Sequence, residues 1–99
     1  MAIKIERSSG NVFRDLGFSR EEAENLRLRS ELMIQLSRVI KDQKLTQTRA
    51  AKLFGISQPR VSDLVRGKIG RFSIDTLIAM LGHAGVRVSL SVRRPRQVA

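Results

Sequence analysis

Several residue types are missing or scarce in this 99-residue chain. It contains no cysteine, no tryptophan and no tyrosine, and only two prolines. The lack of cysteine excludes disulfide bonds and thiolate chemistry. No run of 18 apolar residues occurs, and the first ten residues lack the apolar stretch of a signal peptide. We therefore expect one small, soluble, cytoplasmic domain that does not associate with a membrane.

Aromatic side chains make up only 4% of the residues. The four rings are Phe13, Phe18, Phe54 and Phe72. We expect them to lie in a core that is otherwise aliphatic. Their scarcity also argues against a reader of single-stranded RNA, because such proteins stack bases on aromatic side chains.

Patterns for catalysis and metal binding are also missing. The only histidine, His83, falls near the end of a predicted helix, without cysteines or a second histidine nearby. A packing or capping role at that helix end is the simpler interpretation. Serines and aspartates are present, but no glycine-rich phosphate loop accompanies them. We expect no enzymatic activity, no metal and no cofactor.

Acidic residues are few compared with basic ones. Nine Asp and Glu face 19 Lys and Arg, which gives a net charge of +10. Such an excess favours a polyanionic partner, and DNA, RNA or an anionic membrane would each satisfy it. The excess is greatest over residues 46–72, which contain six basic side chains and a single acidic one, Asp63. This segment is the candidate anion-binding region.

Helical patterns cover most of the chain. Residues 1–18 are expected to be an N-terminal arm with a short helical turn, and Ser19 is expected to cap a long amphipathic helix over residues 20–43. Three shorter helices, over residues 47–54, 58–66 and 74–83, each follow a polar cap and end near a glycine. The caps are Thr46, Ser57 and Ser73. The predicted fold is mainly α, a compact bundle of about four to five helices, with residues 19–85 as the helical domain.

The pattern changes to an alternation of two after the last helix. Val86, Val88, Leu90 and Val92 alternate with Arg and Ser, which predicts a strand over residues 86–93 before a basic tail at 94–99. A lone strand needs a partner. The same strand in a second copy is the economical partner, so we predict a homodimer in which these four side chains face the core. Pairing with residues 3–5 of the same chain is the alternative.

The most informative segment is residues 47–64. Two short helices that cross steeply need a small residue at the crossing and a residue tolerant of positive φ in the turn, and Ala51 and Gly55 supply them. Five apolar side chains are spaced to face the core. They are Ala50, Phe54, Ile56, Val61 and Leu64. This pattern predicts a helix-turn-helix over residues 46–67. A hairpin used only for packing is the alternative, but it does not require the concentrated positive charge.

The segment resembles the helix-turn-helix of the Xre and phage-repressor class, and the predicted fold is accordingly lambda-repressor-like. The resemblance implies that Gln47 contacts phosphate and that the first residues of the second helix contact bases. These base-reading candidates are Gln58, Pro59, Arg60 and Asp63. Glutamine can pair with adenine, arginine with guanine, and proline offers only an apolar contact, for example to a thymine methyl group. For Asp63, a helix-surface or ion-pair role is the alternative.

Other polar and basic residues around the motif are candidate phosphate ligands. Helix N-termini bind phosphate through free N–H groups, and cations that follow the second helix can clamp the DNA backbone. The phosphate candidates are Thr46, Gln47, Arg49, Ser57, Arg66, Lys68 and Arg71. For the last three, a merely solvated loop is the alternative.

Nearly the whole chain resembles one branch of this class, the HigA-like antitoxins. The resemblance includes the segment from Gly10 to Phe18, the acidic start of the long helix, the segment from Gly55 to Gly67, and Phe72–Leu77. It implies a toxin partner and autoregulation at an inverted-repeat operator in double-stranded DNA. A stand-alone Xre-type regulator without a toxin and a non-specific nucleic-acid-binding protein remain as alternatives.

Overall fold

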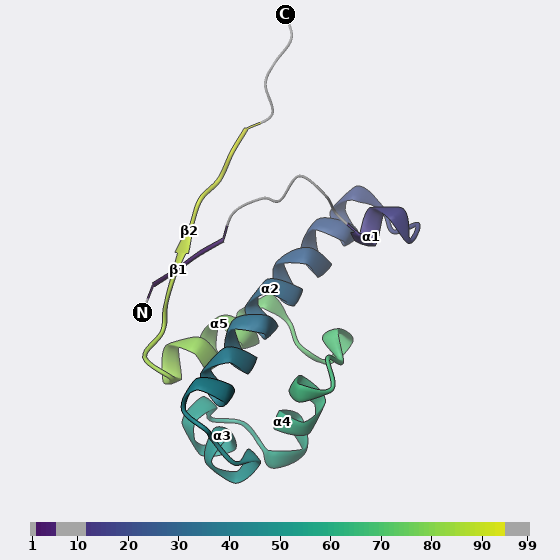
Figure 1. Cartoon of the computed structure of the whole chain (residues 1–99). Coiled ribbons are helices and arrows are strands. Elements are labelled where there is room, and N and C mark those ends of the chain that lie inside the picture. Colours follow the sequence, from purple (N-terminus) through teal and green to yellow (C-terminus); the bar gives the residue numbers. More distant parts are fainter. Residues whose placement is uncertain (1, 6–11, 95–99) are drawn as a thin grey trace, which may run out of the picture.

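The computed structural model describes residues 2–5 and 12–94, and it shows a mainly helical domain built around one long helix (Figure 1). The elements in chain order are β1 (Ala2–Ile5), α1 (Val12–Asp15), α2 (Arg20–Asp42), α3 (Gln47–Phe54), α4 (Gln58–Val65), the 3₁₀ helix η1 (Ile69–Arg71), α5 (Ile74–His83) and β2 (Arg87–Leu90). The short helices α3 and α4 lie at the C-terminal end of α2, and α1 lies at its N-terminal end (Figure 1). The predicted fold class is confirmed.

Side-chain caps set the start of three helices. A hydroxyl accepts a hydrogen bond from the backbone N–H three residues ahead in α2, α3 and α5, and each bond satisfies an N–H that the helix leaves without a partner. The pairs are Ser19 with Glu22 at 3.2 Å, Thr46 with Arg49 at 3.1 Å and Ser73 with Thr76 at 3.1 Å. The helices α2 and α4 each end one residue earlier than predicted, at Asp42 and Val65.

The predicted side-chain cap at Ser57 is wrong. Ser57 has the extended backbone of a capping residue, but its hydroxyl makes no cap hydrogen bond. Pro59 has no N–H to cap, and the N–H groups of Arg60 and Val61 both donate to the Ser57 carbonyl oxygen at 3.1 Å. The start of α4 is therefore set by the proline and the backbone, and the helix does not use the Ser57 hydroxyl.

The core forms where α2 packs on α5 and where α3 packs on α4 and α5. It is mainly aliphatic, and it includes the rings of Phe54 and Phe72. The prediction that all four rings lie in this core is wrong for Phe13 and Phe18, which pack edge-to-face on each other with centroids 6.3 Å apart. The reason is that α1 lies beyond the bundle, beside the start of α2 (Figure 1), and this leaves Phe18 40% exposed.

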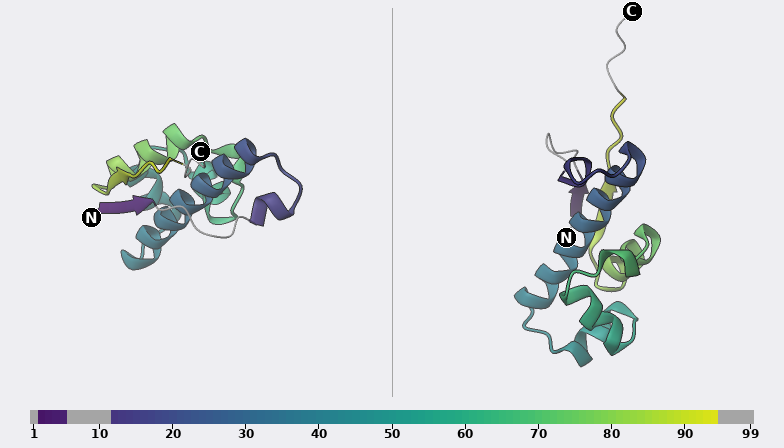
Figure 2. Two further views of the ribbon diagram at one scale, coloured as in Figure 1. Left: turned by 90° about the horizontal axis from the view of Figure 1, so that it is seen from above. Right: turned by 90° about the vertical axis from the view of Figure 1, so that its right-hand side faces the viewer.

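The strand β2 pairs in parallel with β1 of the same chain, with Ile3 opposite Val88. Pairing within the chain is the alternative that the sequence left open beside the predicted pairing with a second copy. The strand is shorter than predicted and covers Arg87–Leu90, and the chain that follows it runs away from the helices (Figure 2). Val86 is buried, and Leu90 and Val92 are 76% and 78% exposed in the single chain, so a core-facing position of these two requires the predicted dimer. Their burial in a dimer stays a prediction.

Two predicted segments lie partly outside the described residues. These are residues 6–11 of the N-terminal arm and residues 95–99 of the basic tail. Within the described ranges, every helix is too short or too polar to cross a membrane.

Candidate nucleic-acid interface

The turn between α3 and α4 depends on a left-handed residue. Gly55 has φ 71° and ψ 33°, and the N–H of Ile56 then donates to the carbonyl oxygen of Ala51 at 3.0 Å. On either side of this turn, four of the five predicted apolar residues are at most 2% exposed, and Ile56 is half-buried. The four are Ala50, Phe54, Val61 and Leu64. The two helices are thus fixed to each other by a shared core.

The first turn of α4 is open to solvent. Gln58 and Pro59, two of the four predicted base-reading residues, are exposed there. Ser62 lies one turn further along, four residues after Gln58, and is half-buried. Sequence analysis missed Ser62, although its helical spacing from Gln58 could have identified it. The end of α4 also leaves Val65 and Arg66 exposed.

Arg60 lies on the side of α4 that faces the following loop. Its guanidinium carbon is 4.9 Å from the centre of the Phe72 ring, which is a cation–π arrangement. Phe72 itself is buried, so the ring offers a fixed surface for a side chain that is only half-buried. Sequence analysis did not find this contact because the two residues belong to different elements.

Asp63 lies between two of the predicted phosphate-binding cations. Its carboxylate oxygens are 3.7 Å from Lys68 Nζ and 3.6 Å from Arg71 Nη1, and the side chain is only 15% exposed. This is the ion-pair role that the sequence left as the alternative to base contact. Lys68 and Arg71 remain 42% and 59% exposed, so both cations can reach a ligand in solvent.

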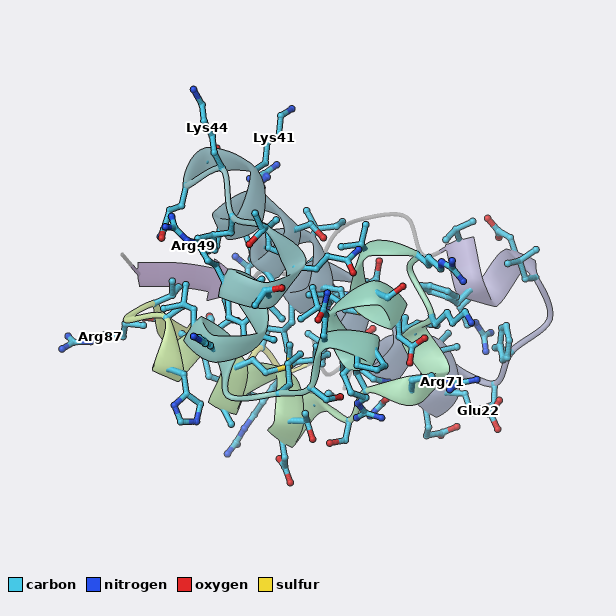
Figure 3. All side chains as sticks on the ribbon, turned by 90° about the horizontal axis from the view of Figure 1, so that it is seen from below. Glu22, Lys41, Lys44, Arg49, Arg71 and Arg87 are labelled. Carbon is cyan, nitrogen blue, oxygen red and sulfur yellow. The ribbon has the colours of Figure 1, made fainter. Side chains whose placement is uncertain are left out.

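A second group of cations lies at the start of the helix-turn-helix. Figure 3 shows Lys41, from the last turn of α2, and Lys44, from the turn before α3, projecting in one direction, with Arg71 towards the opposite side of the view. Sequence analysis did not single out Lys41 and Lys44 as candidates. Lys44 also has a positive φ of 52°, which is uncommon for a residue with a side chain.

All four glutamates of α2 lie within residues 21–31, away from the helix-turn-helix. Arg27 is 7% exposed and contacts Glu24 at 2.7 Å and Glu31 at 2.9 Å. The hydrogen bond that Arg27 donates to Glu24 raises the pKa of Arg27 above its ordinary value, so the guanidinium stays charged. At the helix-turn-helix, Asp63 is the one acidic side chain over residues 46–72, so most of the positive charge there has no acidic neighbour in the sequence. Among the described residues, no cluster of three or more His, Cys, Asp and Glu could hold a metal ion.

An apolar groove of about 470 Å³ runs between α2, the end of α4 and α1. Its wall is mainly apolar, and Arg38 and Lys41 also line it. Two of its residues, Ile34 and Val65, are 49% and 55% exposed. An apolar surface of this kind is typical of a protein contact.

Comparison with known proteins identifies the class to which this geometry belongs. A family model described as a helix-turn-helix domain matches residues 12–93, which include every helix of the structure. The chain belongs to this helix-turn-helix family. A solved structure of a protein named as an XRE-family transcriptional regulator is 32% identical, with a TM-score of 0.71, and the match covers 79% of this chain and 91% of that one. No match was found among curated proteins.

These matches confirm the predicted Xre-type helix-turn-helix, and the chain is an XRE-type DNA-binding transcriptional regulator. The narrower resemblance to antitoxins stays a prediction.

Proposed function

We propose that this XRE-type regulator is a sequence-specific repressor that places α4 in the major groove of its own operator. The observation that carries the proposal is the exposed first turn of α4, flanked by cations on both sides. The major groove admits one α-helix, and the flanking cations would meet the phosphates on either side. Cations placed in this way fix the position of the helix, and the side chains of its first turn then select the sequence.

Four side chains are the proposed base readers. Gln58 would pair with adenine, Arg60 with guanine, and Pro59 would contact a thymine methyl group. Asp63 would accept from a cytosine amino group, but it would first have to leave Lys68 and Arg71. We therefore expect Gln58 and Arg60 to contribute more to sequence selection than Asp63.

The proposed phosphate ligands surround this turn. They are Thr46, Gln47, Arg49, Ser57, Arg66, Lys68 and Arg71, to which the structure adds Lys41 and Lys44 as candidates. The Ser57 hydroxyl makes no cap hydrogen bond, which leaves it available as a donor to a phosphate oxygen. Each phosphate contact should add about 0.9 to the slope of log Kd against log salt concentration.

We also propose that the regulator binds as a homodimer through β2. In the two-stranded sheet of the described residues, β2 is paired with β1 along one edge, with the exposed Leu90 at the end of β2 and the exposed Val92 beyond it. Antiparallel pairing of the other edge with a second β2 would cover both side chains. Two recognition helices related by this twofold axis would bind an inverted repeat with half-sites about 34 Å apart, or a multiple of that.

A gel-shift assay tests sequence-specific repression. The protein is titrated at about 150 mM salt onto its own upstream DNA and onto a shuffled fragment of equal length. We expect tight binding to the upstream DNA that Arg60→Ala weakens selectively. The matched control is Arg20→Ala, which removes an exposed arginine at the far end of α2. Equal, salt-sensitive binding to both fragments would instead indicate a non-specific nucleic-acid-binding protein.

The antitoxin role is a finer proposal that rests on a second surface. Val12, Leu16 and Phe18 are 60%, 69% and 40% exposed around α1, at the end of the molecule away from α3 (Figures 1 and 2). The apolar groove continues this surface along α2 through Ile34. A protein that binds here would leave the first turn of α4 free, so the regulator could hold a toxin and DNA together.

Co-expression with a neighbouring toxin gene tests this role. Leu16→Glu and Ile34→Glu should abolish rescue of growth, because each places a charge in the apolar contact, while operator binding by both variants should survive. Ile78→Glu, at another exposed apolar position, on α5, is the matched control. If no small basic toxin gene lies beside this gene, or if both variants still rescue, the stand-alone regulator is the better description.

A further inference from the structure

The loop after α4 is attached to the long helix α2 by one arginine. Arg29 Nη1 donates to the carbonyl oxygen of Ile69 at 3.1 Å and to that of Phe72 at 3.3 Å. Its Nε donates to Asn25 Oδ1 at 2.7 Å, which orients the guanidinium. These bonds join residues 40 and 43 positions apart in the chain. Arg29 thus spans the two ends of the segment that carries Arg71.

The same loop is also tied to α4. The backbone N–H of Lys68 donates to the carbonyl oxygen of Asp63 at 3.0 Å, and the Asp63 carboxylate faces both loop cations. The Phe72 side chain is 1% exposed and anchors the end of the loop in the core. We refer to residues 67–72 as the cationic loop. It is held in place at its start, its middle and its end before any ligand arrives.

We infer that Arg29 is a positioning residue for DNA binding, which acts by holding the cationic loop so that Lys68 and Arg71 meet phosphates without rearranging. Arg29 itself is half-buried, and its Nε and Nη1 groups donate to Asn25 and to the two backbone carbonyls. Its effect on DNA therefore passes through the loop. A loop that is fixed in the free protein loses less conformational freedom on binding, and this raises affinity. The inference rests on the proposed phosphate role of Lys68 and Arg71.

Hydrogen exchange in the free protein tests the positioning directly. The amides of Arg71 and Phe72 donate within the loop, to Lys68 at 3.0 Å and to Ile69 at 3.3 Å. Arg29→Gln should accelerate exchange at both amides and leave the amides of α3 at the wild-type rate. Arg20→Gln removes the same charge from the same helix and should change neither. Equal exchange in the Arg29→Gln variant and the wild type would overturn the inference without touching the proposed function.

Binding to the upstream DNA then tests whether the positioning matters for function. We expect Arg29→Gln to weaken binding about tenfold, which corresponds to about 1.4 kcal/mol. The double variant Lys68→Ala/Arg71→Ala should lower the salt slope by about two, at roughly 0.9 for each lost contact. Adding Arg29→Gln to that double variant should cause no further loss. An equal loss in both backgrounds would show that Arg29 acts on the fold in general, and would overturn the inference.

Two further results separate the possible failures. If the double variant binds like the wild type while Arg29→Gln still loosens the loop, the phosphate role has failed but the positioning stands. Arg29→Lys keeps the charge but loses the planar guanidinium, whose Nη1 donates to both carbonyls while Nε is held by Asn25, so the affinity of this variant should lie between those of the wild type and Arg29→Gln. If Arg29→Gln does not fold, Arg29→Lys is compared in the two backgrounds in its place, with the same outcomes.

Discussion

One methyl group added in the turn of the helix-turn-helix should lower the stability of the protein. In Gly55→Ala the three heavy atoms nearest the new Cβ would belong to the ring of His83, the closest at 3.4 Å, and that side chain is exposed and can move. The main cost is then the left-handed backbone at φ 71°, which an alanine adopts at about 1–2 kcal/mol. For a domain of this size, we expect the Tm to fall by about 4–8 °C for each kcal/mol lost.

Gly82→Ala is the matched control, because it makes the same chemical change in the opposite setting. Gly82 lies in the last turn of α5, has no positive φ, and has no heavy atom within 4 Å of an added Cβ. Alanine favours a helix over glycine by about 0.5–1 kcal/mol, so this variant should be more stable than the wild type. Thermal and urea unfolding followed by circular dichroism would measure both variants. A Gly55→Ala variant as stable as the wild type would refute the argument from the backbone.

Two further predictions concern local structure. Thr46→Ala and Ser73→Ala should each lower the free energy of unfolding by about 1 kcal/mol, because each removes a side-chain cap. Ser57→Ala should change it by less than about 0.5 kcal/mol, because that hydroxyl makes no cap hydrogen bond. A large loss of stability of Ser57→Ala in urea unfolding would contradict the cap assignment. Lys44→Gly should raise the free energy of unfolding by about 1 kcal/mol, since glycine accepts φ 52° without strain, and should lower the salt slope of operator binding by about 0.9. An unchanged slope would mean that Lys44 does not contact phosphate.

The candidate site was only partly predictable from the sequence. Gln58 and Pro59 could be placed at the start of a helix by the pattern of caps and apolar residues, and the structure has them exposed there. The contacts of Arg60 and Asp63 could not be derived in this way, because both depend on how the cationic loop packs against α4. Arg29 was missed for the same reason: its two carbonyl acceptors are 40 and 43 residues further along the chain.

The sequence by itself determined the helices and the motif. Caps such as Thr46, the spacing of apolar residues around Gly55 and the alternation after Val86 are local signals, and local signals are sufficient where hydrogen bonds join near neighbours. The tertiary structure alone decided which strand pairs with β2, which rings enter the core and which cations are held in place. Those choices depend on distant segments coming together. The local pattern left the pairing of Ile3 with Val88 as one of two alternatives, and it carried no signal for the bond between Arg29 and Ile69.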